Sequence, residues 1–518
     1  MKILQKLSTI LLILLPAIFL MLAVRGLAGN PTPENLLEEK WREAGPFELS
    51  PERGRFALLY SLVEDGSYYF SLPIARFVVP DLGYKDGHYV SLFAPTVSYL
   101  VMPGYILGKL VGYSQLGTFL TVSFVGLINL ILIRRIVKKL TGNSLAGWLA
   151  GFTFLFATPA FTYAVNIYQH HFSTLLILIA INLLSSPPTL PRSFFFWFIV
   201  ALSLSVDNPN LFMMAPLVIY HLIQLLNLTV DANQIILKPS LLKILGVIGV
   251  ALPLYFFGWF NYQSYGNPLQ LAGTIRSVKA LDANGLPANP EDIKNTADPS
   301  KAIETVVKTK TATGFFKTRQ ILNGLYIHTI SPDRGVVRYT PVILLGLIGF
   351  FFLRGRSDHF GPLLASIIGA NILLYSMWGD PWGGWAFGSR YLIPSFAILA
   401  ITLGVALAKM NRNLLLPLLF LPLLYQSIWV NSMGAITTSR IPPKAEVLEL
   451  EKITGVQEKF SYNRTQDYLE NSQLKSFAYN TYFRNNLTGL QYHQILTMLI
   501  YTSCIGLLVA NALVKSKS

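Results

Sequence analysis

The sequence contains little charge and almost no cysteine. Charged residues make up 13% of its 518 residues, and hydrophobic residues make up 52%. Soluble globular proteins carry about 25% charged residues, so this composition argues against a soluble globular protein. The single cysteine, Cys504, excludes a disulfide bond within the chain and argues against a thiolate metal site. The composition predicts a polytopic membrane protein.

Several functional motifs are also absent. The sequence has no G-x-x-x-x-G-K-S/T phosphate loop and no H-E-x-x-H helix, so nothing in it supports ATP hydrolysis or zinc proteolysis. It shows no convincing internal repeat and no matched pair of broken helices, which argues against a secondary transporter.

The basic residues are dispersed along the chain. The formal net charge is +15, but lysine and arginine lie at the ends of apolar runs, where the positive-inside rule places cytoplasmic charges. A nucleic-acid partner is therefore not expected. One basic cluster indicates which end of a predicted helix faces the cytoplasm. It consists of Arg134, Arg135, Lys138 and Lys139.

About twelve apolar runs are interpreted as membrane-spanning helices, with both termini in the cytoplasm and the protein in the plasma (inner) membrane. They cover residues 7–24, 116–137, 144–164, 172–184, 194–206, 211–226, 241–260, 342–353, 363–377, 391–408, 414–430 and 495–514. For the first run a cleaved signal peptide is the alternative, because small residues follow it. This topology puts every long loop on the outer face.

The run at 93–112 is interpreted as an interfacial helix in the first outer loop. If it crossed the membrane, the basic cluster would lie outside, against the positive-inside rule. The predicted divisions are a transmembrane catalytic domain at 1–433 with a first outer loop at 28–92 and a long outer loop at 261–338, a further outer segment at 434–492, and a last transmembrane helix at 493–518.

The stretch 51–105 is too polar to cross a bilayer, yet apolar sequence flanks it. Its carboxylates include Glu52, Asp65, Asp81 and Asp86, a few residues from lipid depth. Ionised groups near hydrocarbon are costly unless a cavity or a partner holds them. The first outer loop is therefore predicted to carry the chemistry.

Five short motifs follow one another along the chain. They are 51–57 (PERGRFA), 86–91 (DGHYVS), 156–159 (FATP) with His170 and His171, 331–341 (SPDRGVVRYTP) and 382–391 (WGGWAFGSRY). Their order resembles that of the membrane-embedded GT-C glycosyltransferases, in particular bacterial relatives of protein O-mannosyltransferases and of the lipid A aminoarabinose transferase. The fold class expected is an all-α polytopic membrane protein of GT-C type.

The resemblance implies transfer of a hexosyl or pentosyl group from a polyprenyl-phosphate donor to an acceptor hydroxyl on the outer face, with inversion. A carboxylate would take the acceptor proton while the sugar carbon gains oxocarbenium character. Glu52 and Asp81 both fit this role, and the choice stays open because Glu52 is followed by Arg53, where relatives often carry a second acidic residue. Arg390 is the first candidate for binding the phosphate. Further phosphate candidates are Arg334, Arg338 and Lys85.

Other side chains of the motifs are candidates for binding substrate, namely Asp86, His88, Tyr89, His170, His171, Trp382 and Trp385. Each also has a structural explanation, because Asp-Gly is a turn dipeptide, interfacial histidines serve as hydrogen-bonded anchors, and tryptophans populate aromatic belts. No obligatory cofactor is expected, although carboxylates clustered with His88 would suit Mg²⁺ or Mn²⁺.

Two other functions remain open from the sequence: a lipid-linked glycan transporter or flippase, and a glycan polymerase or ligase. A translocation path places charges at mid-membrane, whereas the candidates here gather at the outer face, which favours the transferase. The expected partners are membrane lipid, a polyprenyl-phosphate sugar donor, and a glycan, lipid or protein acceptor.

Overall fold

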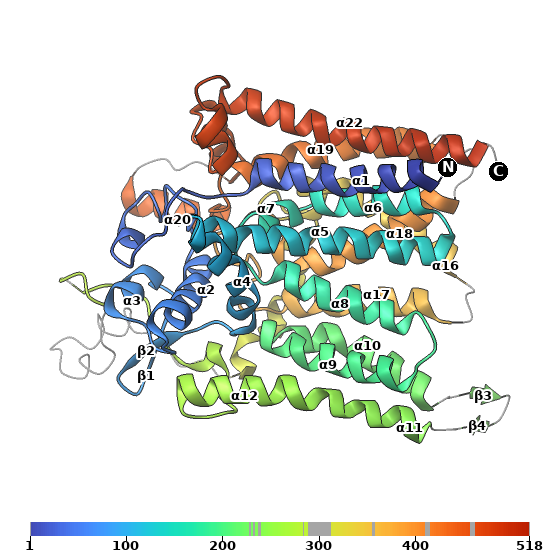
Figure 1. Cartoon of the computed structure of the whole chain (residues 1–518), viewed down its shortest axis with the longest axis horizontal. Coiled ribbons are helices and arrows are strands. Elements are labelled where there is room, and N and C mark those ends of the chain that lie inside the picture. Colours follow the sequence, from blue (N-terminus) through green and yellow to red (C-terminus); the bar gives the residue numbers. More distant parts are fainter. Residues whose placement is uncertain are drawn as a thin grey trace.

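The computed structural model describes residues 2–226, 229–231, 234–236, 240–282, 284–287, 312–354, 358–409, 415–455 and 461–516. Part of the predicted long outer loop therefore lies outside the described residues. Within them the protein is mainly helical, and the long helices lie side by side in one bundle (Figure 1).

The bundle helices are α1 (Lys2–Ala23), α5 (Ser114–Thr141), α6 (Ser144–Phe156), α8 (His170–Leu184), α9 (Leu190–Val206), α10 (Asn210–Leu226), α11 (Leu241–Ile244), α12 (Ala251–Tyr265), α16 (Gly346–Leu353), α17 (Phe360–Ser376), α18 (Ile393–Lys409), α19 (Leu415–Ile436) and α22 (Gly489–Ser516). The other α-helices and the strands are α2 (Ser50–Tyr60), α3 (Leu72–Val78), α4 (Thr96–Leu110), α7 (Ala160–Ala164), α14 (Ile321–Thr329), α15 (Val336–Tyr339), α20 (Lys444–Thr454), α21 (Ser461–Glu470), β1 (Leu82–Lys85), β2 (His88–Ser91), β3 (Thr229–Asp231), β4 (Gln234–Ile236) and β5 (Arg276–Val278).

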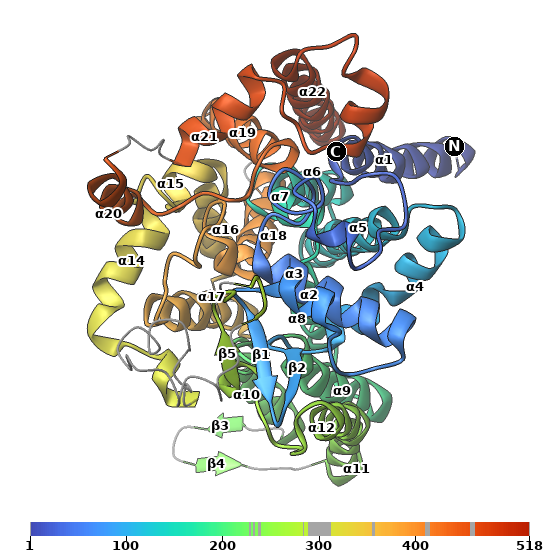
Figure 2. The same ribbon diagram turned by 90° about the vertical axis from the view of Figure 1, so that its left-hand side faces the viewer.

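Five helical stretches are long and apolar enough to cross a membrane, and they differ in how deeply they are buried. The stretch that contains α18 is 89% buried, whereas the one that contains α12 is 17% buried. Figure 2 shows α18 near the middle of the bundle and α12 at its edge. An apolar helix that is buried all round belongs to the core, and an apolar helix left exposed suits a lipid surface. Every predicted span overlaps an apolar helix, while the number that crosses remains a prediction.

The polar segments gather at one end of the bundle. Figure 1 shows α2, α3, α4, α20 and the β1–β2 hairpin at this end and both chain termini at the other. We call the end that carries α2 the loop end. That all the long loops share one face, and on which side of the membrane they lie, remain predictions.

The expectation of an all-α chain is wrong in two places, the loop end and the antiparallel strand pair β3–β4 that follows α10. Strands β1, β2 and β5 form an antiparallel sheet in the order β2-β1-β5. Asp86 and Gly87 make the tight turn between β1 and β2, and both have a positive φ, of 48° and 83°. Glycine adopts such a conformation at low cost, and Asp-Gly is a common pair in two-residue hairpin turns. The strands are only three or four residues long, and β5 is remote in sequence, so no local alternation marks the sheet.

The predicted span at 144–164 is interrupted. Helix α6 ends at Phe156 and α7 starts after Pro159, which has no amide hydrogen to continue a helix. The Thr158 hydroxyl donates to the Phe154 carbonyl at 2.7 Å and closes the last turn. The break leaves α7 and the loop that follows it at the loop end, where they contribute to the site described below.

Helix α4 corresponds to the predicted interfacial helix and packs closely on α5. A Cβ atom on Gly104 would lie 2.4 Å from the Gly117 carbonyl oxygen, so the two backbones approach as only glycine permits. Leu107 and Leu110 on the outer side of α4 are 66% and 78% exposed. Such a surface suits contact with lipid, and the interfacial position itself stays a prediction.

Candidate functional site

The carboxyl group of Glu52 is buried at the start of α2. Pro51 lies in the first turn of this helix, where proline is well tolerated. Glu52 Oε2 accepts a hydrogen bond from the Leu49 amide at 3.1 Å, as an acidic side chain near a helix start commonly does. Glu52 Oε1 accepts a second one from Asn166 Nδ2 at 3.1 Å. The side chain has no solvent exposure.

The protonation of Glu52 is tuned by its surroundings. Burial is the main cause that raises the pKa of Glu52, to about 7, and the Glu48 carboxylate adds to it while the Arg25 guanidinium opposes it. A carboxyl group that titrates near neutral pH can accept a proton and release it again. Perturbed carboxyl groups of this kind concentrate at functional sites.

Arg55 lies one turn after Glu52 on the same helix. Its Nη1 donates to the Pro51 carbonyl at 2.9 Å, and its Nη2 donates to Gln169 Oε1 at 2.6 Å. Gln169 Nε2 in turn donates to Asp207 Oδ2 at 3.2 Å. These contacts join α2 to the loop before α8 and to the turn between α9 and α10.

Aromatic rings flank the Arg55 guanidinium. Its Cζ atom lies 4.5 Å from the centroid of the Phe93 ring and 5.9 Å from that of Tyr168. A Cβ atom on Gly54 would come within 2.4 Å of the Phe93 ring, so glycine at this position lets the ring reach α2.

Arg390 approaches the same tyrosine from the other half of the chain. Its Cζ atom lies 5.3 Å from the centroid of the Tyr168 ring and 5.4 Å from that of Tyr391. Its Nη2 donates to the Gly383 carbonyl at 2.6 Å. Gly383 has a φ of +73°, a conformation that favours glycine. Two guanidinium groups therefore converge on one ring.

Several buried polar atoms around Tyr168 have no hydrogen-bond partner among the described residues. They are Arg55 Nε, Arg390 Nε, Tyr168 Oη and His170 Nε2. The ring of His170 lies nearly parallel to that of Tyr168. Burial, and next the Glu52 charge, raise the pKa of Tyr168 well above its usual value, while Arg390 and Arg55 oppose the rise. Buried donors without partners cost free energy unless a ligand or solvent pairs with them. We call Glu52, Arg55, Tyr168, His170 and Arg390 the Tyr168 cluster.

Arg334 holds the loop that carries Arg390. Its buried guanidinium donates to the carbonyls of Trp382, Gly384 and Ile441, at 3.0, 3.1 and 2.7 Å, and to that of Asp333 at 2.8 Å. These bonds assign Arg334 to the scaffold of the site rather than to a ligand. The other candidate from the same motif, Arg338, is exposed on α15.

Asp81, the second candidate base, is ion-paired. Its Oδ1 accepts from Lys279 Nζ at 3.0 Å, and its Oδ2 accepts from the Ser50 hydroxyl at 2.5 Å. Burial raises the pKa of Asp81, but the Lys279 charge and the Ser50 hydroxyl together lower it by more, so the pKa of Asp81 lies below its ordinary value. The side chain is 28% exposed. A carboxylate with a lowered pKa is a weaker base than Glu52. Asp81 nevertheless lies close to α2, because Ser50 at the start of this helix donates to it.

Four other candidates lie on the β1–β2 hairpin, away from the Tyr168 cluster. Lys85 pairs with Asp86 at its exposed tip, with Nζ and Oδ2 at 3.0 Å. The ring of His88 stacks on Tyr69 at 4.1 Å between centroids. The Tyr89 hydroxyl donates to the carbonyl of residue 287 at 3.3 Å.

The remaining candidates take structural contacts. His171 Nε2 lies 2.8 Å from the Ala160 carbonyl oxygen, which anchors α8 to α7. Trp385 Nε1 donates to Glu446 Oε1 at 2.7 Å, and Trp382 is half-buried in the loop that Arg334 holds. Among the described residues, no group of three His, Cys, Asp or Glu side chains is placed to hold a metal ion.

Sequence reasoning did not single out Arg55, Tyr168, Gln169 or Asp207. The signal for Arg55 was its spacing of three residues from Glu52, which places both side chains on one face of a helix. Tyr168 and Gln169 directly precede His170, but no local feature shows that they meet α2. Asp207 lies directly after α9, and no local feature shows that it meets Gln169.

A buried ion triad joins the segment before α2 to the end of α1 and to the segment after α21. Glu48 Oε2 lies 2.6 Å from Arg25 Nη1, and Glu48 Oε1 lies 2.6 Å from Lys475 Nζ. Ser439 adds backbone and hydroxyl donors at 2.8 and 3.0 Å. Burial raises the pKa of Glu48, but the Lys475 and Arg25 charges outweigh it and lower the pKa to about 2. The triad positions the segment from which α2 starts.

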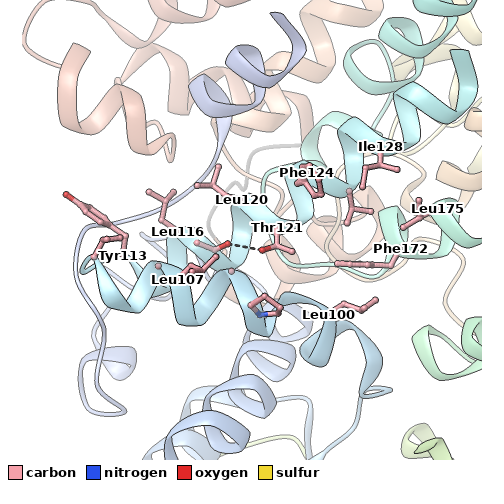
Figure 3. A pocket seen from close by; sticks show the side chains of 16 residues that line it. Leu100, Leu107, Tyr113, Leu116, Leu120, Thr121, Phe124, Ile128, Phe172 and Leu175 are labelled. Carbon is pink, nitrogen blue, oxygen red and sulfur yellow. Dashed lines mark hydrogen bonds between the residues drawn. The ribbon is translucent and has the colours of Figure 1, made fainter. Parts of the chain in front are cut away.

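An apolar groove with a volume of about 820 Å³ lies beside the site (Figure 3). Its walls are α4, α5 and the first turns of α8, and Figure 3 shows Leu100, Leu120, Phe124 and Phe172 along it. Helix α4 also reaches the site, because the Ser98 hydroxyl donates to the Arg55 carbonyl at 2.9 Å. The groove and the Tyr168 cluster therefore share α4 and α8 as walls.

Comparison with known proteins finds no matching family model and no matching curated protein. The chain is similar in structure to ArnT from Cupriavidus metallidurans bound to undecaprenyl phosphate, with a TM-score of 0.47 and 11% identity over 98% of this chain and 77% of that one. The apo state of the same protein gives a TM-score of 0.46 and 10% identity, over 98% of this chain and 78% of that one.

A second similarity is to the oligosaccharyltransferase of Archaeoglobus fulgidus in its apo form, with a TM-score of 0.39 and 12% identity over 95% of this chain and 56% of that one. ArnT is the aminoarabinose transferase that the sequence motifs also resemble. Likenesses with TM-scores below 0.5 do not assign a function, so the proposal below depends on the residues of this chain.

Proposed function

We propose that this protein is a membrane glycosyltransferase that moves a sugar from a polyprenyl-phosphate donor to an acceptor hydroxyl. The observation that carries the proposal is the placement of one buried carboxyl group with a pKa of about 7, Glu52, in the same cluster as two arginines with unpaired Nε atoms. Sugar transfer from a phosphate needs this pair of functions, a base for the acceptor and fixed positive charge for the leaving group.

In the proposed reaction Arg390 and Arg55 bind the donor phosphate. The acceptor oxygen attacks the anomeric carbon as its proton passes to Glu52, and the bond from that carbon to the phosphate oxygen breaks. The electron pair of this bond leaves with the polyprenyl phosphate, whose negative charge the guanidiniums stabilise. Attack opposite to the leaving group inverts the anomeric centre. Asp81 is the alternative base, which the proposal ranks second because Lys279 holds it.

The apolar groove would hold the prenyl chain. The transfer of hydrocarbon from water to an apolar wall lowers the free energy. Helices α4 and α8 link the groove to the Tyr168 cluster. A phosphate in the cluster and a chain in the groove could thus belong to one lipid molecule.

The test uses purified full-length protein in lipid nanodiscs, a synthetic polyprenyl phosphate carrying a radiolabelled sugar, and a total membrane extract as acceptor source. Glu52→Gln and Arg390→Ala are expected to reduce sugar transfer by about 100-fold or more. Asp86→Asn, at the exposed hairpin tip, is the matched control and is expected to keep full activity.

The alternatives give different results. Full transfer by Glu52→Gln with loss in Asp81→Asn would move the base to Asp81. Movement of the labelled lipid between leaflets without any cleavage of the sugar bond would replace the transferase by a flippase. Parallel assays with EDTA and with added Mg²⁺ or Mn²⁺ test the expectation that no ion is obligatory.

A further inference from the structure

A second polar cavity lies at the end of the bundle opposite to the Tyr168 cluster. It has a volume of about 480 Å³ and lies where α5 and α8 end and α9 begins, which Figure 1 shows at the end that carries the chain termini. Its lining consists of Arg135, Lys138, Lys139, Asn182, Leu183, Ser186 and Arg192. We call this cavity the basic pocket, because four of the seven side chains are cationic and none is acidic.

In the part of the chain that the structure describes, no carboxylate neutralises the positive charges of the basic pocket. Among the described residues, no salt bridge joins any of the four cations to an acidic side chain. Lys139 Nζ donates to the Ser185 and Ser186 hydroxyls at 2.8 and 2.5 Å, and Arg192 Nη1 donates to the Pro187 carbonyl at 2.9 Å. These bonds hold two of the cations through uncharged partners, so their positive charge remains available to an anion.

The protein backbone adds to the positive potential. Helix α9 begins at Leu190, and Thr189 Oγ1 accepts the Arg192 amide at its first turn. The first turn of α9 contains no acidic residue. Helix N-termini favour anions, and here the start of α9 coincides with the cavity and its cations.

Apolar side chains continue from the basic pocket along the helices. Leu183 lines the pocket itself, and Ile179 precedes it by one turn on α8. On α9, Phe195 follows Arg192 by three residues and is 56% exposed. An anionic headgroup in the pocket would thus have apolar surface beside it for its acyl chains. A free anion in solution would gain nothing from that surface.

Scattered cations at this end would be explained by the positive-inside rule alone. The basic pocket differs because its four cations surround one cavity together with a hydroxyl group and a carboxamide, from Ser186 and Asn182. We propose that the basic pocket binds the headgroup phosphate of an anionic phospholipid from the membrane leaflet opposite to the Tyr168 cluster. This site is separate from the proposed transfer reaction and does not depend on it.

The test compares lipid binding by two triple variants with equal loss of charge. The pocket variant combines Arg135→Gln, Lys138→Gln and Arg192→Gln. The control variant combines Lys243→Gln, Arg354→Gln and Lys409→Gln, whose cations lie outside the basic pocket. Full-length protein in detergent is titrated with phosphatidylglycerol, with phosphatidylcholine and with inorganic phosphate, and bound lipid is counted by native mass spectrometry.

The wild type is expected to retain phosphatidylglycerol in preference to phosphatidylcholine. The pocket variant should lose about tenfold or more in phosphatidylglycerol affinity, and the control variant about twofold or less. Equal losses in both variants would show a general charge effect and overturn the proposal. So would displacement of the lipid by millimolar inorganic phosphate, which would identify a free-anion site. Because five of the six substituted cations are exposed and Lys243 is half-buried, both variants should elute as the wild type does on size exclusion.

Discussion

Glu52 and Asn166 share a hydrogen bond of 3.1 Å between Oε1 and Nδ2, although 114 positions separate them in sequence. The bond joins the start of α2 to the loop after α7, and it places the carboxyl group beside Tyr168 and the two arginines. It also stabilises the ionised form of Glu52, because an amide donor to a carboxylate favours the charged state.

The pH dependence of transfer should report Glu52. With a pKa of about 7, the carboxylate that accepts the proton forms as the pH rises through neutrality, so kcat/KM should increase with pH up to about 7 and then level off. Asn166→Leu removes the donor to the carboxylate and should move the rise to higher pH. Asn35→Ala, at a half-buried position in the segment before α2, serves as the control and should leave the profile in place. An unchanged profile in Asn166→Leu would show that another group titrates.

Glu52 should also limit the stability of the protein. Its pKa is raised from an ordinary value of 4.5 to about 7, so the folded protein binds this proton more tightly than the unfolded chain does. The stabilising effect of protonated Glu52 is complete below pH 4.5 and is lost as the pH rises through 7. At pH 8, Glu52→Gln should therefore be more stable than the wild type by about 2–3 kcal/mol, with little difference at pH 4.5. Thermal unfolding at both pH values measures this, and a destabilised variant at pH 8 would contradict it.

The two arginines of the late motifs should behave differently when replaced by lysine. Arg390→Lys keeps a positive charge but loses the paired donors, so the KM for the polyprenyl-phosphate donor should rise by about tenfold or more with little change in unfolding temperature. Arg334→Lys strands buried carbonyl oxygens of the loop and should cost about 2–4 kcal/mol of stability. The comparison measures donor KM and thermal unfolding for both variants. A normal unfolding temperature for Arg334→Lys would remove its scaffold role.

Glu48 should be essential for stability rather than for chemistry. Glu48→Gln leaves the buried Arg25 and Lys475 charges without a carboxylate and should lower the free energy of unfolding by about 3–5 kcal/mol. Because the pKa of Glu48 is lowered to about 2, its stabilising effect is present above its ordinary value of 4.5 and is lost as the pH falls towards 2. Glu38→Gln, which removes an exposed ion pair with Lys40, is the control and should change little. Equal stability of the two variants would refute the assignment.

The apolar groove should discriminate donors by chain length. Leu120→Asn places a polar amide in the groove. The KM for long-chain donors should therefore rise by about tenfold, while the KM for short-chain donors stays at the wild-type value. Leu418→Asn, on the 68% exposed outer surface of α19, provides the control. Equal effects of Leu120→Asn on both donors would place the prenyl chain elsewhere.

Much of the bundle could be predicted from the sequence. Runs such as 116–137 and 391–408 have the length and apolar composition of spanning helices, and the structure forms α5 and α18 there. The turn at Asp86-Gly87 is a local signal too. Hydropathy and turn chemistry act over a few neighbouring residues, which is why they can be recognised before any fold is known.

Apolar helices, the polar segments between them, and motifs in which Glu52 and Arg390 could supply a base and a phosphate ligand can all be recognised in the amino-acid sequence. The sequence does not reveal that Arg55 and Tyr168 join these two residues, that Lys279 pairs with Asp81, or that Arg334 binds backbone carbonyls. These features appear only in the folded protein, because burial and charge pairing depend on contacts between segments far apart in the chain. Those contacts set the pKa of a carboxyl group and the free donors of a guanidinium, and no local pattern records them.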